Sequence, residues 1–239
     1  MTDFVLMHGA FHGGWCWAPV AERLRAAGHR VFTPTQTGLG ERRHLLSKDI
    51  TLETFVRDLT EVIEAEELTD AVLVGHSFGG NAISGAADRM PERIRRLVYF
   101  DSLILENGGS PAERYPPPVW EARRQLAETT SGGVSVPAPS PAEFGVKPGP
   151  AFDWLARRMT PHPFGTFTSR LALDNPVGNS LPCTYITCTE PLHAALASTR
   201  DWVRDRPGWQ LREIADCHDV MATDPEAFTA LLLDIVGGG

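Results

Sequence analysis

The sequence predicts an α/β fold with a mainly parallel sheet of about six strands and helices on both faces. In the first and last parts of the chain, apolar runs typical of strands alternate with segments typical of helices. Between them lies a stretch of about 80 residues, rich in proline and glycine, which has no strand pattern and is too long for a simple connection. We therefore expect a mostly helical cap, residues 102–180, inserted into a core made of residues 1–101 and 181–239.

Six short apolar runs are expected to form the sheet. Each run is rich in valine, leucine, isoleucine or aromatic residues and is bounded by glycine, proline or charged residues, as buried strands are. We find no internal repeat. The six expected strands are residues 3–8, 30–35, 71–74, 96–100, 183–188 and 209–214.

Helices are expected between most of these strands. The clearest covers residues 51–67, where six apolar side chains fall on one face opposite acidic residues. Pro19 and Pro225 suit the first turns of the first and last helices. The other expected helices are 18–27, 80–90, 194–204, one beginning near 224, and two in the cap at 119–128 and 152–159.

Composition narrows the class of function. The formal net charge is −8, so no basic surface for nucleic acid or anionic membrane is expected. No apolar run approaches the roughly 18 residues that cross a bilayer, and no secretory signal pattern is present. We expect a cytoplasmic protein with neither nucleic acid nor membrane as a partner, and leave a homodimer open. The four cysteines form no C-x-x-C pair and are expected to be reduced thiols.

The segment Gly75-His76-Ser77-Phe78-Gly79 is the candidate reactive site. It follows an apolar strand and opens onto a helix, which is the context of a nucleophile elbow. A serine on so sharp a turn adopts a strained backbone conformation, and the glycines relieve crowding between strand and helix. The helix N-terminus favours negative charge that develops there. Ser77 is the expected nucleophile, although G-x-S-x-G also occurs in plain turns.

His218 is the expected base for this serine. Side chains that act together in parallel sheets gather at the carboxyl ends of the strands, and His218 lies in the loop after the last strand. Four of the other histidines are expected at the surface or in the cap: His29, His44, His162 and His193. His8 and His12 are expected to hold a glycine-rich loop together by hydrogen bonds. No cysteine or carboxylate at ligand spacing joins His8, His12 and His76, so no metal is expected.

Two carboxylates compete to orient His218. Glu190 follows the strand 183–188, and Asp101 ends the strand 96–100. Either strand end can place a carboxylate near the imidazole. Asp216 and Asp219 flank the histidine too closely in the chain to point at its Nδ1. We favour Glu190 and keep Asp101 as the alternative acid.

Two backbone N–H groups are expected to form an oxyanion hole. One belongs to Phe78, which follows the serine, and the other to Ala10 in the glycine-rich loop after the first strand. Aromatic side chains of this loop and of the cap either hold the cap together or line an apolar pocket. The candidate lining residues are Phe11, Trp120, Trp154 and Phe164.

With these residues, the chain resembles members of the α/β-hydrolase superfamily. Within it the chain is similar to the small-cap group that contains plant methylesterases, hydroxynitrile lyases and bacterial carboxylesterases such as pyrethroid and carbendazim hydrolases. The resemblance implies the α/β-hydrolase fold, and it implies a triad acid after the strand before the last, which matches Glu190. It covers nearly the whole chain, and its most specific segments are HGAFHGGWCW at 8–17, PTQTGLGERRH at 34–44, LVGHSFGG at 73–80 and CHD at 217–219.

The resemblance also favours hydrolysis over cyanohydrin cleavage. Hydroxynitrile lyases of this group have a threonine and a lysine where this sequence has Gly9 and Asp219. We therefore predict a serine hydrolase that cleaves a carboxylic ester, or a carbamate or amide, of a small and largely apolar molecule through an acyl-enzyme. No cofactor is expected. The alternatives are a lyase on the same fold and a non-catalytic receptor for a small ligand.

Overall fold

Six parallel strands form the central sheet of the structure, a computed structural model that describes residues 1–238. Their order across the sheet is β2-β1-β3-β4-β7-β8, and each neighbouring pair is parallel. The prediction of a six-stranded parallel sheet is thereby confirmed. All six carboxyl ends meet at one edge, where open α/β sheets bind ligands. The strands are β1 (Asp3–Met7), β2 (Arg30–Phe32), β3 (Ala71–His76), β4 (Ile94–Phe100), β7 (Cys183–Cys188) and β8 (Trp209–Ile214).

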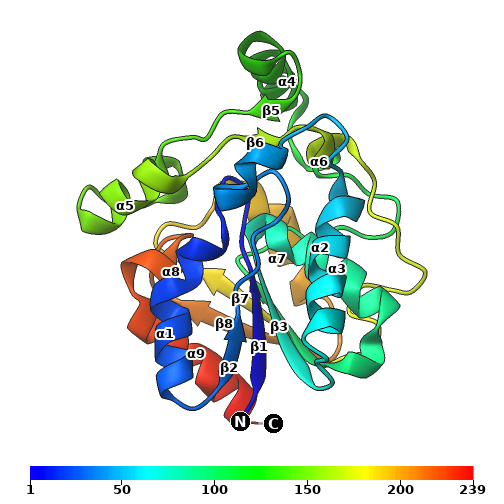
Figure 1. Ribbon diagram of the computed structural model, residues 1–239, viewed down its shortest axis with the longest axis vertical. Coiled ribbons are helices and arrows are strands. Elements are labelled where there is room, and N and C mark those ends of the chain that lie inside the picture. The colour runs from blue at the N-terminus through cyan, green and yellow to red at the C-terminus, as the bar shows by residue number, and fades with distance from the viewer. Residues whose placement is uncertain (239) are drawn as a thin grey trace.

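Helices cover both faces of the sheet (Figure 1). They are α1 (Ala18–Ala26), α2 (Leu52–Ala65), α3 (Gly80–Arg89), α7 (Ala197–Arg204), α8 (Val220–Thr223) and α9 (Pro225–Gly237). Because side chains alternate along a strand, each face has its own apolar core. Phe4 and Leu6 of β1 pack in the core with α1 and α9, whereas Val5 and Met7 pack in the core with α2 and α3.

Helix α2 shows how local sequence produces one of these elements. Thr51 caps it through a capping box with Thr54, whose hydroxyl accepts the Thr51 N–H at 3.1 Å. Its apolar stripe is buried against α3, and Gly85 lets the two helices approach closely, since a Cβ there would lie 2.4 Å from Val56. The amphipathic pattern therefore decides where this helix packs.

The chain between β4 and β7 lies over the carboxyl edge of the sheet (Figure 1). It contains a two-stranded antiparallel ladder, where no strand was expected from the sequence. Each strand of this ladder has two residues, too few to show a periodic pattern. We retain residues 102–180 as the proposed extent of the cap. Its elements are α4 (Pro117–Ser131), β5 (Ser135–Val136), α5 (Pro150–Arg158), β6 (His162–Pro163) and α6 (Gly165–Thr168).

Two further features follow from the coordinates of residues 1–238. No helix in this range combines the length and the apolar character needed to cross a membrane. The four cysteines are buried and free, and they are Cys16, Cys183, Cys188 and Cys217.

Candidate active site

Ser77 stands on a strained turn between β3 and α3. Its φ is +51°, in the left-handed region that residues with a side chain rarely adopt. The neighbouring glycines are required by space, because a Cβ on Gly75 would lie 2.9 Å from the Gly80 backbone and one on Gly79 would lie 2.7 Å from the His8 carbonyl oxygen. The expected elbow is therefore present, and Ser77 is partly exposed.

The carbonyl of Ser77 is held by the chain that follows β4. Its oxygen accepts hydrogen bonds from the Ser102 hydroxyl at 2.7 Å and from the Leu103 N–H at 3.0 Å. These bonds join the turn after β3 to the turn after β4. Asp101 lies at the start of that second turn, so its position is tied to that of the serine.

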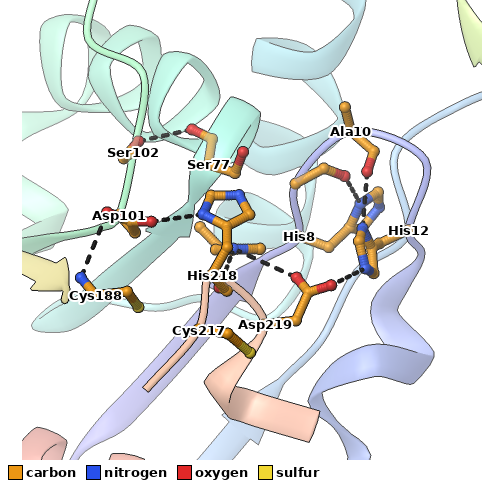
Figure 2. Close-up of polar contacts among 12 residues, drawn as sticks. His8, Ala10, His12, Ser77, Asp101, Ser102, Cys188, Cys217, His218 and Asp219 are labelled. Atoms are coloured by element: carbon orange, nitrogen blue, oxygen red, sulfur yellow. Dashed lines mark hydrogen bonds and ion pairs between the residues drawn. The ribbon is translucent and has the colours of Figure 1, made fainter. Parts of the chain in front are cut away.

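His218 contacts Asp101 from the loop after β8. Its Nδ1 lies 2.6 Å from Oδ2 of Asp101, and the two side chains are 2% and 0% exposed. The other carboxylate oxygen of Asp101 accepts the Cys188 N–H at 3.4 Å. Because a carboxylate only accepts, the imidazole proton lies on Nδ1 and leaves Nε2 free to take a proton. Figure 2 shows Ser77 next to this ring.

The expectation that Glu190 orients His218 is wrong. The Glu190 side chain is exposed, and the Nδ1 position is already taken by Asp101. The strand order alone does not decide between the two acids, since β7 lies between β4 and β8, the strand that leads to His218. The physical reason is the direction of the side chains: the Asp101 carboxylate is buried and reaches Nδ1 of His218, whereas the Glu190 side chain turns to solvent. Asp101, our alternative acid, also has a φ of +37°, a tight turn at the strand end.

The loop after β1 lies against the serine. A Cβ on Gly9 would approach the Cβ of Ser77 to 2.8 Å, so only glycine permits this contact. Gly9 also has its carbonyl bonded to Nδ1 of His8 at 2.8 Å. That carbonyl and the Ala10 N–H are opposite ends of one planar peptide group, so the bond from His8 sets the direction of the Ala10 N–H.

The next peptide group of this loop is held at both ends. His12 places its Nδ1 2.7 Å from the Ala10 carbonyl oxygen, and the Phe11 N–H donates to Nδ1 of His162 at 3.3 Å. Phe11 has a φ of +68°, so the loop is strained as well as fixed. The structural roles expected for His8 and His12 agree with these bonds.

The surface or cap placement expected for His162 and His193 leaves out their contacts with the site. His162 lies in β6 of the proposed cap, but it is fully buried there and bonds to the loop after β1. His193 is partly exposed in the loop after β7, and its ring lies tilted against that of His218, with centroids 4.5 Å apart. Neither histidine lies in a motif, so no signal in the sequence identified them.

Burial controls the protonation of these histidines. It lowers the pKa of His8 to about 3 and that of His193 to about 4, and it holds the pKa values of His76 and His162 well below the usual range. His12 is the exception. Burial works against its charged form, but the Asp219 carboxylate nearby outweighs burial and raises the pKa of His12.

A cavity of about 830 Å³ opens onto Ser77 beneath the cap. Phe11 lines it, as predicted. The other three candidates do not: Trp120 stacks on Phe164 with centroids 5.5 Å apart, and Trp154 packs edge-on against Trp15 at 5.0 Å. The first pair of rings packs within the cap, and the second joins the cap to the core. The aromatic side chains that line the cavity are Phe11, Phe78, Tyr115, Phe144 and Phe167.

Comparison with known proteins identifies the family of the chain. Residues 4–231 match the model of the alpha/beta hydrolase family, so the chain belongs to that family. The carbendazim hydrolyzing esterase of Nocardioides sp. (strain SG-4G) is 39% identical to this chain, over 94% of this chain and 96% of the esterase chain. Methylesterase 7 of Arabidopsis thaliana is 28% identical over 97% and 95% of the two chains.

Solved structures agree on the fold. An extracellular alpha/beta-hydrolase from a Paenibacillus species superimposes with a TM-score of 0.86 at 24% identity, covering 98% of both chains. The predicted fold and family resemblance are confirmed. The relatives named as esterases also confirm the predicted class of enzyme, a carboxylesterase-type hydrolase.

Proposed function

We propose that Ser77, His218 and Asp101 form the catalytic triad of this ester hydrolase. Ser77 attacks the ester carbonyl while Nε2 of His218 takes its proton, and Asp101 holds the imidazole and stabilises its charged form. The protonated His218 then gives its proton to the departing alcohol, which leaves an acyl-enzyme. A water molecule repeats the two steps and releases the acid. The observation that carries this proposal is the 2.6 Å bond between His218 and Asp101 beside a serine on a strained elbow.

The N–H groups of Ala10 and Phe78 are proposed to bind the oxyanion of the tetrahedral intermediates. Phe78 directly follows the serine at the start of the helical turn that leads into α3, where N–H groups have no helical acceptor. Ala10 lies in the loop packed against Ser77, and the His8 bond to the Gly9 carbonyl fixes the plane that carries its N–H. A donor of this kind contributes about 3 kcal/mol to transition-state binding.

The cavity favours a small substrate with an aromatic or alicyclic body. Its aromatic lining suits such a body, and pockets of this size hold small organic molecules. Relatives of the chain include enzymes named for carbendazim and for methyl esters, which supports small-molecule esters as substrates and keeps carbamates as candidates.

Two guanidinium groups also line the cavity, those of Arg114 and Arg123. Arg123 lies over the rings of Tyr115 and Phe167 at 4.7 and 5.0 Å, and no carboxylate among residues 1–238 forms an ion pair with it. Arg42, in the loop after β2, is by contrast paired with Asp58 at 3.0 Å. We propose that Arg123 receives an acceptor or anionic group of the substrate, remote from the bond that is cleaved.

The other two classes of function are less well supported. A lyase that releases cyanide needs a cation near the leaving group, and the position after His218 holds the buried carboxylate of Asp219. A receptor has no need for a serine held at a positive φ beside an oriented histidine. Both alternatives remain distinguishable by experiment.

The direct test of this function compares wild type with Ser77→Ala on p-nitrophenyl esters of increasing acyl size. We expect wild type to hydrolyse them and Ser77→Ala to lose nearly all activity. Methyl carbamates are tested in the same assay. If wild type turns over no ester and no carbamate, the hydrolase proposal is wrong.

A further inference from the structure

A second carboxylate lies directly behind the base. Asp219 follows His218 in the chain and is fully buried, with no exposed side-chain surface. One of its oxygens is 3.4 Å from Nε2 of His12 (Figure 2). The other is 3.8 Å from Nε2 of His76. The mechanism proposed above does not use this group, and burying a charged carboxylate costs free energy unless it is paired.

One hydrogen bond and one ion-pair contact assign the charge of His12. Nδ1 of His12 faces the Ala10 carbonyl oxygen, which only accepts, so Nδ1 carries a proton. Nε2 of the same ring lies 3.4 Å from Oδ2 of Asp219, an ion-pair distance without hydrogen-bond geometry, and neither side-chain oxygen of Asp219 accepts a hydrogen bond within residues 1–238. Because a buried carboxylate that accepts no hydrogen bond needs a cation beside it, this contact assigns a second proton to Nε2, and His12 and Asp219 form a buried imidazolium–carboxylate pair. The raised pKa of His12 and the lowered pKa of Asp219, each caused by the other against the effect of burial, agree with this assignment.

The pair lies between the two loops that carry the reacting groups. On one side, His12 holds the carbonyl of Ala10, the proposed oxyanion donor. On the other side, Asp219 is covalently next to His218, and Nε2 of His76 donates to the His218 carbonyl at 3.0 Å. Any shift of Asp219 therefore moves the base, and through His12 it also moves the oxyanion loop.

We propose that Asp219 is a positioning residue, which holds the loop of the base and the loop of the oxyanion donor at a fixed separation through the charged ring of His12. This inference rests on the proposed function. It assigns a role to the position where the related lyases have a lysine, and it predicts an effect on turnover that exceeds any effect on substrate binding. If apolar residues of the same shape replaced His12 and Asp219, they would fill the same space but could not hold the two loops by charge.

Three variants test the proposal: Asp219→Ala, Asp219→Asn and, as a matched control on the same loop, Asp216→Asn. Asp216 does not line the cavity, and its Oδ1 accepts hydrogen bonds from the Thr223 hydroxyl and from the N–H of Cys217, contacts that an amide oxygen keeps. The concentration of active sites is measured by titration with a fluorophosphonate, so kcat refers to folded, reactive enzyme. Melting temperature is recorded for each variant.

We expect Asp219→Ala to lower kcat per active site by roughly 10- to 100-fold, a part of what a lost oxyanion donor costs, with KM within about twofold. Asp219→Asn should lie between it and wild type, because an amide can still donate to Nε2 of a neutral His12. Asp216→Asn should stay within about twofold of wild type. If kcat per active site is unchanged in Asp219→Ala while the melting temperature falls, Asp219 is structural only and the proposal is overturned.

A spectroscopic measurement on wild type keeps the proposal testable if Asp219→Ala does not fold. Nitrogen NMR of histidine-labelled enzyme at pH 8 should show one ring with both nitrogens protonated, and this signature should be absent from Asp219→Asn and from His12→Gln. Its absence from wild type contradicts the ion pair. An active wild type and an inactive Ser77→Ala preserve the proposed function even if this inference fails.

Discussion

Asp101 and His218 are separated by 117 positions in the chain, yet their side chains meet at 2.6 Å. The contact forms because β4 and β8 both end at the edge of the sheet where the serine stands. This contact places the acid at the end of β4, beside the strand that leads to Ser77, and it leaves no orienting role for Glu190.

The first prediction separates these two carboxylates. Asp101→Asn should lower kcat on the order of 10³- to 10⁴-fold, because an amide can donate to Nδ1 and stabilise the wrong tautomer of the imidazole. Glu190→Gln, the same change at an exposed site, should stay within about twofold of wild type. Steady-state kinetics on one p-nitrophenyl ester checks both, and a large loss in Glu190→Gln would restore our original assignment.

A catalytic residue could be predicted from the sequence where the residues next to it in the chain identify it. Ser77 lies in a motif whose strand, turn and helix adjoin it, and His218 follows an identifiable last strand, so both were found. The acid depends on which strand end turns its carboxylate toward His218, and that follows from packing between residues far apart in the chain. The place of Glu190 after the strand before the last suits the family pattern but carries no information on where its side chain points.

The cap illustrates the same limit. The helix expected at 119–128 lies within α4, and the one expected at 152–159 overlaps α5, which ends at Arg158, because their apolar spacing is local. Which aromatic rings face the cavity depends on the path of the chain between them. Trp120 and Trp154 are large aromatic residues of the kind that line apolar pockets, but both pack against other aromatic rings.

The second prediction concerns the contact between Gly9 and Ser77. Gly9→Ala places a Cβ 2.8 Å from the Cβ of Ser77 and 3.0 Å from Nδ1 of His76, so the oxyanion loop has to move away. We expect kcat to fall at least tenfold, on the scale set by loss of one donor. Gly237→Ala is the matched control, since a Cβ there meets nothing within 4 Å. An unchanged kcat in Gly9→Ala would show that the loop is not part of the reacting site.

The third prediction concerns stability in acid. His8 is buried and neutral with its pKa lowered to about 3, so between pH 6.5 and 3 the unfolded chain binds more protons than the native one. The free energy of unfolding should therefore fall as the pH drops below 6.5, by up to about 1.4 kcal/mol per pH unit for each such histidine. The raised pKa of His12 acts in the opposite sense, since its contribution is present below the unfolded pKa and lost as the pH rises through the folded one.

Urea unfolding at pH 7.5, 6.0 and 5.0 measures this dependence. His8→Gln should reduce the slope between pH 6.0 and 5.0, whereas His44→Gln, on the exposed surface, should leave it unchanged. If the free energy of unfolding of wild type stays constant over this pH range, the buried histidines are protonated in the native state as easily as in the unfolded chain, and the prediction is wrong.

The fourth prediction tests the role of Arg123 in substrate choice. A pair of p-nitrophenyl esters, one of glutaric acid with its second carboxylate free and one of pentanoic acid, differs mainly in a remote negative charge. Arg123→Gln should lower kcat/KM for the charged ester about tenfold and for the neutral ester less than twofold, as expected for one lost charge-assisted contact. Arg124→Gln is the control, because Arg124 pairs with Glu121 on the exposed face at 2.6 Å. Equal losses on both esters would remove Arg123 from recognition.

The central claim is that Ser77 is the residue that becomes acylated. Wild type and Ser77→Ala are each incubated with a fluorophosphonate, digested and mapped by mass spectrometry, and residual esterase activity is measured in parallel. We predict one adduct per wild-type molecule, on the peptide that contains Ser77, with complete loss of activity, and no adduct on Ser77→Ala. An adduct on another residue, or undiminished hydrolysis by Ser77→Ala, would contradict the account.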